Sequence, residues 1–173
     1  MDTNHETKKL FMYAILCLSL AVGLSSGVFS NYFKDVFAVD SVQRGLLEIP
    51  RETPGILCVV ILTALSGLGN LSLMVMAYGF CTLGLAVLGL LSPSYFIMQI
   101  FLFSFSLGEH MMMPLRDSIA MDLSGEGKTG TFLGQLKGKM TLASMTASAA
   151  VFIGYRTGLF WFGDGVIPSF VAG

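Results

Sequence analysis

The most conspicuous absence in this sequence is charge. The stretch from Thr53 to Gly108 holds 56 residues without Asp, Glu, Lys or Arg. The hydrocarbon core of a bilayer is about 30 Å thick, and about 20 apolar residues cross it as a helix. The stretch is therefore long enough for two crossings and most of a third, which excludes a water-soluble domain. The whole chain shares this bias, with 54% hydrophobic residues, 12% charged residues and a mean hydropathy of +0.74.

Basic charge and cysteine are scarce as well. The net charge is −1, so no basic surface predicts nucleic acid as a partner. The three cysteines, Cys17, Cys58 and Cys81, lie in apolar stretches without CxxC spacing. We expect them to be small buried hydrophobic residues, with no disulfide, metal site or cofactor. The partner that the composition predicts is the lipid bilayer itself.

Apolar runs predict an all-α membrane protein, a bundle of five transmembrane helices plus a partial sixth. Residues 1–9 form a polar tail, and residues 10–173 are expected to form the bundle. The first run has no Ala-x-Ala cleavage site and further spans follow it, which favours a retained helix over a signal peptide. The expected spans are residues 10–30, 50–68, 71–91, 95–117 and 134–155, with 159–173 as the start of a sixth.

The second of these spans carries charges at its beginning. Its apolar part is too short to cross alone, so the helix is expected to begin at or before Pro50, since proline suits the first helical turn. Arg51 and Glu52 then lie at or just inside the membrane boundary, and a bend is expected at Pro54. Glu48, Arg51 and Glu52 are three and four residues apart, so they can pair along one helix. This segment is either a solvated helix start or an outer gate.

The distribution of Lys and Arg predicts the orientation, because cytoplasmic loops carry the excess of these residues. With the N-terminus inside, six basic residues fall on the inner side: Lys8, Lys9, Arg116, Lys128, Lys137 and Lys139. Four fall on the outer side: Lys34, Arg44, Arg51 and Arg156. The sequence therefore predicts a multi-pass protein of the cell membrane with a cytoplasmic N-terminus.

The fourth span carries the most polar side chains. On a helix, Gln99, Ser106, His110 and Asp117 fall within about 40° of arc, so they form one polar stripe. Glu109 lies on an adjoining face. Ionisable residues in lipid are costly and usually face a cavity or a partner. One face of this span is therefore expected to look into the protein or a water-filled path.

Two interpretations of these residues stay open. A carboxylate and a histidine can bind substrate or carry a proton, which makes Glu109 and His110 candidates for function. Alternatively, Glu109 pairs with an arginine elsewhere and His110 hydrogen-bonds a neighbouring helix. Arg116 and Asp117, near the inner boundary, are expected to form a structural or gating salt bridge.

Small residues recur at four-residue spacing, which is typical of tight helix–helix contacts in membranes. They are Gly23 and Gly27 in the first span, and Gly130, Gly134, Gly138, Ala143, Ser144, Ala147 and Ser148 around the fifth.

Three stretches carry a family resemblance. They are residues 27–33 (GVFSNYF), 43–48 (QRGLLE) and 113–120 (MPLRDSIA). With the short loops and the charged loop after the fourth span, the chain resembles the N-terminal half of a major facilitator superfamily transporter. The resemblance implies secondary active transport of a small solute by alternating access, driven by an ion or proton gradient. It places Asn31, Glu109 and His110 in the cavity lining, and Arg51, Glu52, Arg116 and Asp117 at gates.

Two departures accompany the resemblance. The loop between the second and third helices usually carries acidic and basic residues in this family, whereas positions 67–70 have none. Such transporters also have two six-helix halves with substrate bound at the midplane between them. The sequence is therefore expected to be a truncated product or fragment that lacks a C-terminal half.

The sequence also bears on two functions other than transport, an interaction protein and an intramembrane enzyme. A half-sized chain with small-residue faces could be a non-transporting interaction protein that forms a homodimer or pairs with another subunit. An intramembrane enzyme is not expected, because the sequence has no HExxH and no pair of catalytic aspartates.

Overall fold

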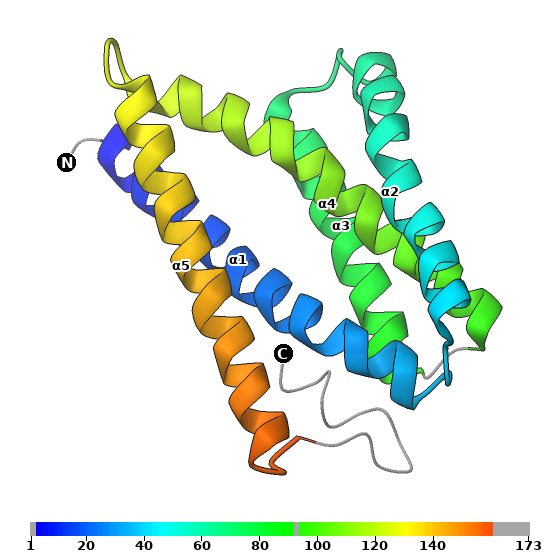
Figure 1. Ribbon diagram of the computed structural model, residues 1–173. Helices are drawn as coiled ribbons and strands as arrows, with labels where there is room; N and C mark the ends of the chain where they lie inside the picture. Colours follow the sequence, from blue (N-terminus) through cyan, green and yellow to red (C-terminus); the bar gives the residue numbers. More distant parts are fainter. Residues whose placement is uncertain (1–2, 92–93, 161–173) are drawn as a thin grey trace. The chain divides into compact units, whose positions relative to one another are not determined.

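The computed structural model describes residues 3–91 and 94–160, and this part of the chain contains helices and no strands (Figure 1). The all-α prediction is confirmed. The helices are α1 (Thr3–Asp35), α2 (Ser41–Ala64), α3 (Asn70–Leu90), α4 (Tyr95–Ser124) and α5 (Thr129–Arg156). Short loops join them; the loop between α4 and α5 turns through Gly125 and Gly127, whose φ angles are +80° and +70°.

Three of the helices are long and apolar enough to cross a membrane: Glu6–Asp35, Asn70–Leu90 and Tyr95–Ser124. The prediction of five such spans and a partial sixth is therefore wrong by this measure. In α2, any stretch long enough to cross contains Glu48, Arg51 and Glu52. In α5, lysines near the start and many Ser, Thr and Gly residues lower the mean hydropathy. Of the expected sixth span, residues 161–173 lie outside the described residues.

The helix boundaries also differ from the prediction. Helix α1 begins at Thr3, so most of the expected polar tail is helical, and it extends beyond residue 30 to Asp35. Helix α2 begins at Ser41, well before Pro50, because Asp40 caps it: its carboxylate accepts hydrogen bonds from the backbone N–H groups of Val42 and Gln43. The Gln43 side chain accepts one in return from the Asp40 N–H, which completes a capping box. The helix continues through both of its prolines.

The described residues form two compact units where the sequence predicts one bundle. One unit holds residues 3–31 and 120–160, and the other holds residues 32–91 and 94–119. The boundaries fall inside α1 and inside α4. The first unit contains most of α1 and all of α5, while the second contains α2, α3 and most of α4.

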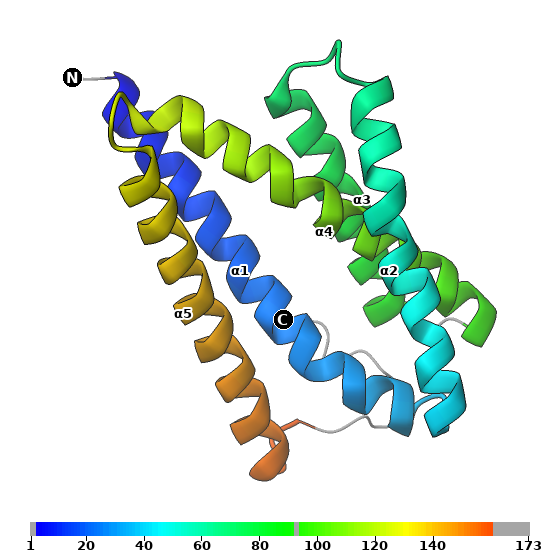
Figure 2. The same ribbon diagram turned by 45° about the horizontal axis from the view of Figure 1, so that its top comes forward.

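In the first unit, α1 and α5 lie side by side (Figures 1 and 2). A Cβ at Gly23 would lie 2.6 Å from the Ser144 carbonyl oxygen and 3.0 Å from the Ala147 Cβ. The Ser148 hydroxyl donates to the Gly23 carbonyl at 3.1 Å, and Gly27 packs against Val151. The predicted small-residue contact is confirmed for these two glycines. The absence of a side chain lets the two backbones approach.

The other three predicted packing glycines behave differently. A Cβ at Gly130, Gly134 or Gly138 would meet no atom within 4 Å in the described part of the chain. All three are exposed. The prediction of a tight contact there is not confirmed, because spacing alone does not reveal which face of a helix meets a neighbour.

In the second unit, α3 and α4 make a contact that the sequence analysis missed. Gly84 of α3 lies against Phe105, and Gly108 of α4 lies against the backbone of Ala77 and Cys81. The Cys81 thiol donates to the Phe105 carbonyl at 3.4 Å. Ala77, Cys81 and Gly84 are four and three residues apart, so the helical spacing of small residues was the available signal.

The three cysteines do not share one environment. Cys58 and Cys81 are buried as expected, but Cys17 is exposed, so the prediction of a buried residue is wrong there. Cys17 lies on a face of α1 that nothing in the described residues covers.

One end of the second unit is held by aromatic residues. Tyr32, at the end of α1, is fully buried, and its hydroxyl donates to the Leu88 carbonyl of α3 at 3.1 Å. Its ring meets Phe37 edge-on at a centroid distance of 5.3 Å, and Phe37 meets Tyr95 of α4 at 6.1 Å. These contacts tie together the ends of three helices, and so support the placement of α3 against α4.

Candidate functional site

The polar side chains of the second unit gather where α2 and α4 meet. On α2, an Arg51 NH group donates to the Glu48 carboxylate at 3.2 Å, and Arg51 Nε lies 3.5 Å from a Glu52 carboxylate oxygen. The predicted pairing along the helix is confirmed. All three side chains are about half exposed. Arg51 therefore bridges two carboxylates on one side of α2.

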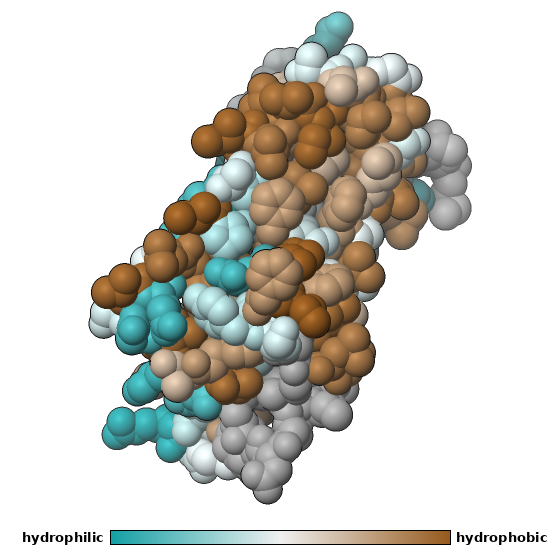
Figure 3. All heavy atoms as spheres, turned by 90° about the vertical axis from the view of Figure 1, so that its right-hand side faces the viewer, coloured by the Kyte–Doolittle hydropathy of each residue, from teal (hydrophilic) through white to brown (hydrophobic). Residues whose placement is uncertain are grey.

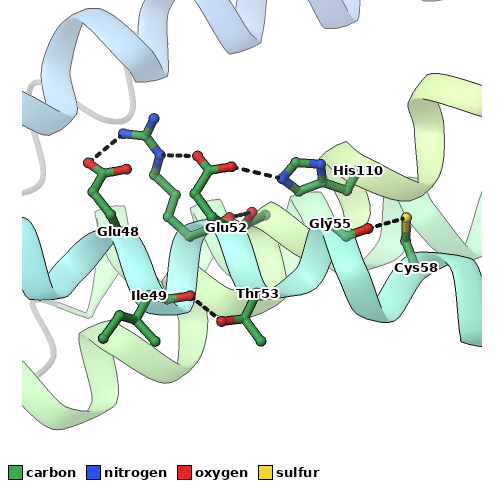
Figure 4. Close-up of polar contacts among 9 residues, drawn as sticks. Glu48, Ile49, Glu52, Thr53, Gly55, Cys58 and His110 are labelled. Atoms are coloured by element: carbon green, nitrogen blue, oxygen red, sulfur yellow. Dashed lines mark hydrogen bonds and ion pairs between the residues drawn. The ribbon is translucent and has the colours of Figure 1, made fainter.

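Helix α4 contributes Ser106 and His110 to the same place. Figure 4 shows His110 beside Glu52. The Ser106 side chain is buried, and its hydroxyl donates to the Arg51 carbonyl. His110 Nε2 lies 4.0 Å from a Glu52 carboxylate oxygen, at the limit of an ion pair. The two residues are one helical turn apart on the polar stripe that the sequence predicts. The stripe therefore faces α2 at this level.

Gly55 makes this arrangement possible. A Cβ at Gly55 would lie 3.2 Å from His110 Cε1 and 3.3 Å from His110 Nδ1. The imidazole ring thus lies against the α2 backbone, in the space that any side chain at this position would take. The sequence analysis did not single out Gly55; a glycine on the charged side of a helix was the available signal.

Glu109 differs from Glu48 and Glu52 because it pairs with no basic side chain within the described residues. Its side chain is half-buried on α4, and its charge interacts with His110, Arg51 and Glu52. Within the described residues it makes neither a hydrogen bond nor an ion pair, so the alternative of a direct partner arginine is not seen. Its charge also interacts with Cys81 of α3.

We name Glu48, Arg51, Glu52, Ser106, Glu109 and His110 the α2–α4 polar cluster. It holds three carboxylates against one guanidinium, so it is negative whenever His110 is neutral. A negative cluster with a histidine can hold a proton or a cation, and such groups act strongly where the dielectric is low. The described residues contain no group of three His, Cys, Asp or Glu side chains placed to hold a metal ion.

Arg116 and Asp117 form the ion pair that the sequence predicts. Arg116 Nε donates to the Asp117 carboxylate at 2.9 Å, and the two side chains are 15% and 30% exposed. Next to them, the Asn70 side chain donates to the Ser118 hydroxyl at 2.9 Å. The first residue of α3 therefore meets α4 through a neutral hydrogen bond, which the sequence analysis did not anticipate.

The remaining predicted site residue is Asn31. It is half-buried on α1 and belongs to the first unit, whereas Glu109 and His110 belong to the second. The prediction that these three residues line one cavity stays a prediction.

Comparisons with protein families, with curated proteins and with solved structures found no match to this chain. The resemblance to the major facilitator superfamily therefore stays an inference from residues 27–33, 43–48 and 113–120.

Proposed function

We propose that this chain is a component of a secondary transporter in the cell membrane, where it moves a small solute in exchange or together with a proton or another ion. The observation that carries the proposal is the α2–α4 polar cluster. It places Glu109 and His110 in the middle of α4, a helix apolar enough to cross a membrane. Ionisable residues at such a depth are expensive, and they usually mark a path for ions or substrate.

The cluster suits a coupling site for a chemical reason. Glu109 has no direct partner among the described residues, so it is available to a proton or to a cationic group of the solute. His110 and Glu52 can exchange a proton across the gap between α2 and α4. Arg51 limits the negative charge of the site by holding Glu48 and Glu52. Under this proposal Arg116–Asp117 is a gate on the cytoplasmic side, and the N-terminus is cytoplasmic.

The proposal is tested with the purified chain in sealed liposomes that contain a pH-sensitive dye. A panel of amino acids, sugars, organic acids and organic cations is added outside, one at a time, with a pH gradient imposed. We expect at least one class to drive a change of internal pH, and Glu109→Gln to abolish it. If no class moves protons or accumulates, transport by this chain alone is wrong.

A second candidate function is a non-transporting interaction subunit. The observation that favours it is the open space beside Gly130, Gly134 and Gly138 on α5. Small residues in a membrane helix allow another helix to approach closely. Inert liposomes together with a stable dimer in detergent, lost in Gly134→Leu, would favour this function over transport.

A further inference from the structure

In the first unit, α1 and α5 run in the same direction and pack with their residues in step. A Cβ at Gly23 would lie 3.0 Å from the Ala147 Cβ. One turn later on both helices, a Cβ at Gly27 would lie 3.1 Å from a Val151 methyl carbon. Figures 1 and 2 show the N-terminal ends of the two helices at the same end of the unit. These contacts therefore show which residues of α1 and α5 lie at the same level.

Five of the six lysines of the chain gather at this N-terminal end. They lie in the first halves of α1 and α5 or directly before α5, and they are Lys8, Lys9, Lys128, Lys137 and Lys139. We name these five residues the basic end of the first unit. All of them are exposed except Lys8, which is half-buried.

The two lysines inside α5 lie level with a part of α1 that is already apolar. Counting back in equal steps from the contact between the helices places Lys137 level with Tyr13, which is 64% exposed. Leu10, at 69% exposure, lies almost one turn nearer the N-terminus of α1. Exposed tyrosine is typical of the interface between membrane and water. Lys137 and Lys139 are therefore at the level where the surroundings of this unit change from water to lipid.

The exposed surface of α5 changes character just after these lysines. Every exposed residue from 129 to 139 is polar or glycine. The large exposed side chains farther along α5 are Leu142, Met145, Phe152 and Ile153. Apolar side chains also cover most of the face on which α2 is drawn, as the brown spheres of Figure 3 show. Such surfaces match acyl chains, so the two lysines mark the headgroup layer beside the first unit.

The first unit supplies little negative charge at this level. Its described residues include three carboxylates, Glu6, Asp122 and Glu126, and α5 has none. Glu6 pairs with Lys9 at 3.1 Å, while Asp122 and Glu126 precede α5. Within the described residues, the Lys139 side chain makes neither an ion pair nor a hydrogen bond. A cation at the edge of the acyl layer is costly without an anion beside it, so Lys139 needs one from outside the described chain.

We propose that the basic end of the first unit binds an anionic phospholipid, with the lipid phosphate at the ammonium groups of Lys137 and Lys139. Lysine suits this position because its long stem can lie along apolar surface while the charge reaches the headgroup layer. The approach is open, since a Cβ at Gly134 or Gly138 would meet nothing within 4 Å in the described part. The inference rests on the membrane location in the proposed function and not on transport.

The net charge of the headgroup decides which lipid fits. A phosphatidylcholine headgroup carries an ammonium group of its own, which adds a like charge beside the lysines and weakens the attraction. A phosphatidylglycerol headgroup carries the phosphate charge alone. A lysine near an anionic membrane surface contributes about fivefold to affinity. The structure therefore fits phosphatidylglycerol better than phosphatidylcholine.

The test is native mass spectrometry of the full chain, released from detergent micelles that contain equal amounts of dioleoyl phosphatidylglycerol and dioleoyl phosphatidylcholine. The ratio of the two lipid adducts measures the preference. We expect phosphatidylglycerol to dominate in the wild type. Lys137→Gln and Lys139→Gln should each lower the ratio by about fivefold. A double variant with Lys137→Arg and Lys139→Arg should keep the ratio, because it keeps both charges.

Lys34→Gln combined with Arg156→Gln is the matched control. It removes two positive charges from exposed positions in the last turns of α1 and α5, far from the basic end. We expect this variant to keep the wild-type ratio. An equal loss in the control and in Lys137→Gln combined with Lys139→Gln would mean that the lipid responds to total charge, which would overturn the site. Equal adducts of both lipids on the wild type would overturn it as well.

A carbonate wash separates this inference from the proposed function. The chain is placed in vesicles of phosphatidylcholine and phosphatidylglycerol and washed with sodium carbonate at high pH. If the wash removes the protein, the membrane location and the lipid site are both wrong. If the protein stays and shows no preference for phosphatidylglycerol, the lipid site alone is wrong. A preference that the lysine variants lose, in a chain that moves no solute, supports the lipid site and contradicts transport alone.

Discussion

The imidazole of His110 lies against the backbone of Gly55, with a hypothetical Cβ only 3.2 Å from the ring. This contact joins α4 to α2 at the level where His110 approaches Glu52. Because a ring packed on a backbone has little room to move, Gly55 controls where the imidazole can lie. The relationship makes Gly55 a positioning residue for the α2–α4 polar cluster.

Replacing Gly55 should therefore disturb His110. Gly55→Leu should destabilise the protein by about 1 to 3 kcal/mol, as overpacking does in other cores. In a His5→Gln background His110 is the only histidine, so its ring C–H signals in an NMR spectrum report directly on it. We expect these signals to shift in Gly55→Leu. Gly45→Leu is the control, because a Cβ at Gly45 meets nothing within 4 Å in the described part; equal shifts in both variants would refute the contact.

The hydroxyl of Ser106 should contribute to the contact between α2 and α4. Ser106→Ala removes the hydrogen bond to the Arg51 carbonyl without changing the helix, and should cost about 0.5 to 1.5 kcal/mol. Thr146→Ala is the comparison, because the exposed Thr146 hydroxyl donates only to the Leu142 carbonyl of its own helix. Thermal unfolding in detergent measures both. A Ser106→Ala variant as stable as wild type would mean that the bond is not formed.

Replacement by alanine should have opposite effects on stability at Gly23 of α1 and at Gly134 of α5. A Cβ at Gly23 would lie 2.8 Å from the Ser144 Cα, so Gly23→Ala must push the two helices apart and should cost about 1 to 3 kcal/mol. Gly134→Ala meets open space and should be neutral or stabilise by up to about 1 kcal/mol, through helix propensity. The measurement is the free energy of unfolding of both variants, obtained by denaturant unfolding and compared with that of the wild type. A destabilised Gly134→Ala would show that this face is in contact after all.

The ion pair between Arg116 and Asp117 should contribute more to the stability of the protein than an exposed ion pair does. Arg116 is 15% exposed, so Asp117→Asn leaves a largely buried guanidinium without its charged acceptor at 2.9 Å. We expect a loss of about 1.5 to 3 kcal/mol. The Lys9–Glu6 pair is half exposed, and Glu6→Gln should cost about 0.3 to 0.5 kcal/mol. The difference between the two variants in thermal unfolding is the measurement, and equal losses would contradict the role of burial.

Several features could be predicted from the sequence because they depend on near neighbours along the chain. The run without charge from Thr53 to Gly108 predicts apolar helices, and the structure contains helices there. The pairing of Glu48, Arg51 and Glu52 follows from helical spacing alone. The same holds for the polar stripe of α4, since Ser106 and His110 are four residues apart and must share a face.

The beginning of α2 agrees with the prediction that the helix starts at or before Pro50, but the proline does not lie in its first turn. Pro50 suits a first helical turn, but the capping box at Asp40 and Gln43 starts the helix earlier. Both signals are local. The prediction gave weight to the proline and to the need for an apolar span, whereas the backbone hydrogen bonds of the cap determine where the helix begins.

What the sequence by itself determined is that the described chain is helical and which charges each helix carries, because these depend on residues a few positions apart. Only the tertiary structure decided that Gly23 and Gly27 make contacts while Gly130, Gly134 and Gly138 do not. It also decided that His110 meets Gly55 and Glu52, which belong to a different helix and lie far away along the chain. Such pairs form when two helices pack in one register, and that register depends on the fit of all the side chains between them.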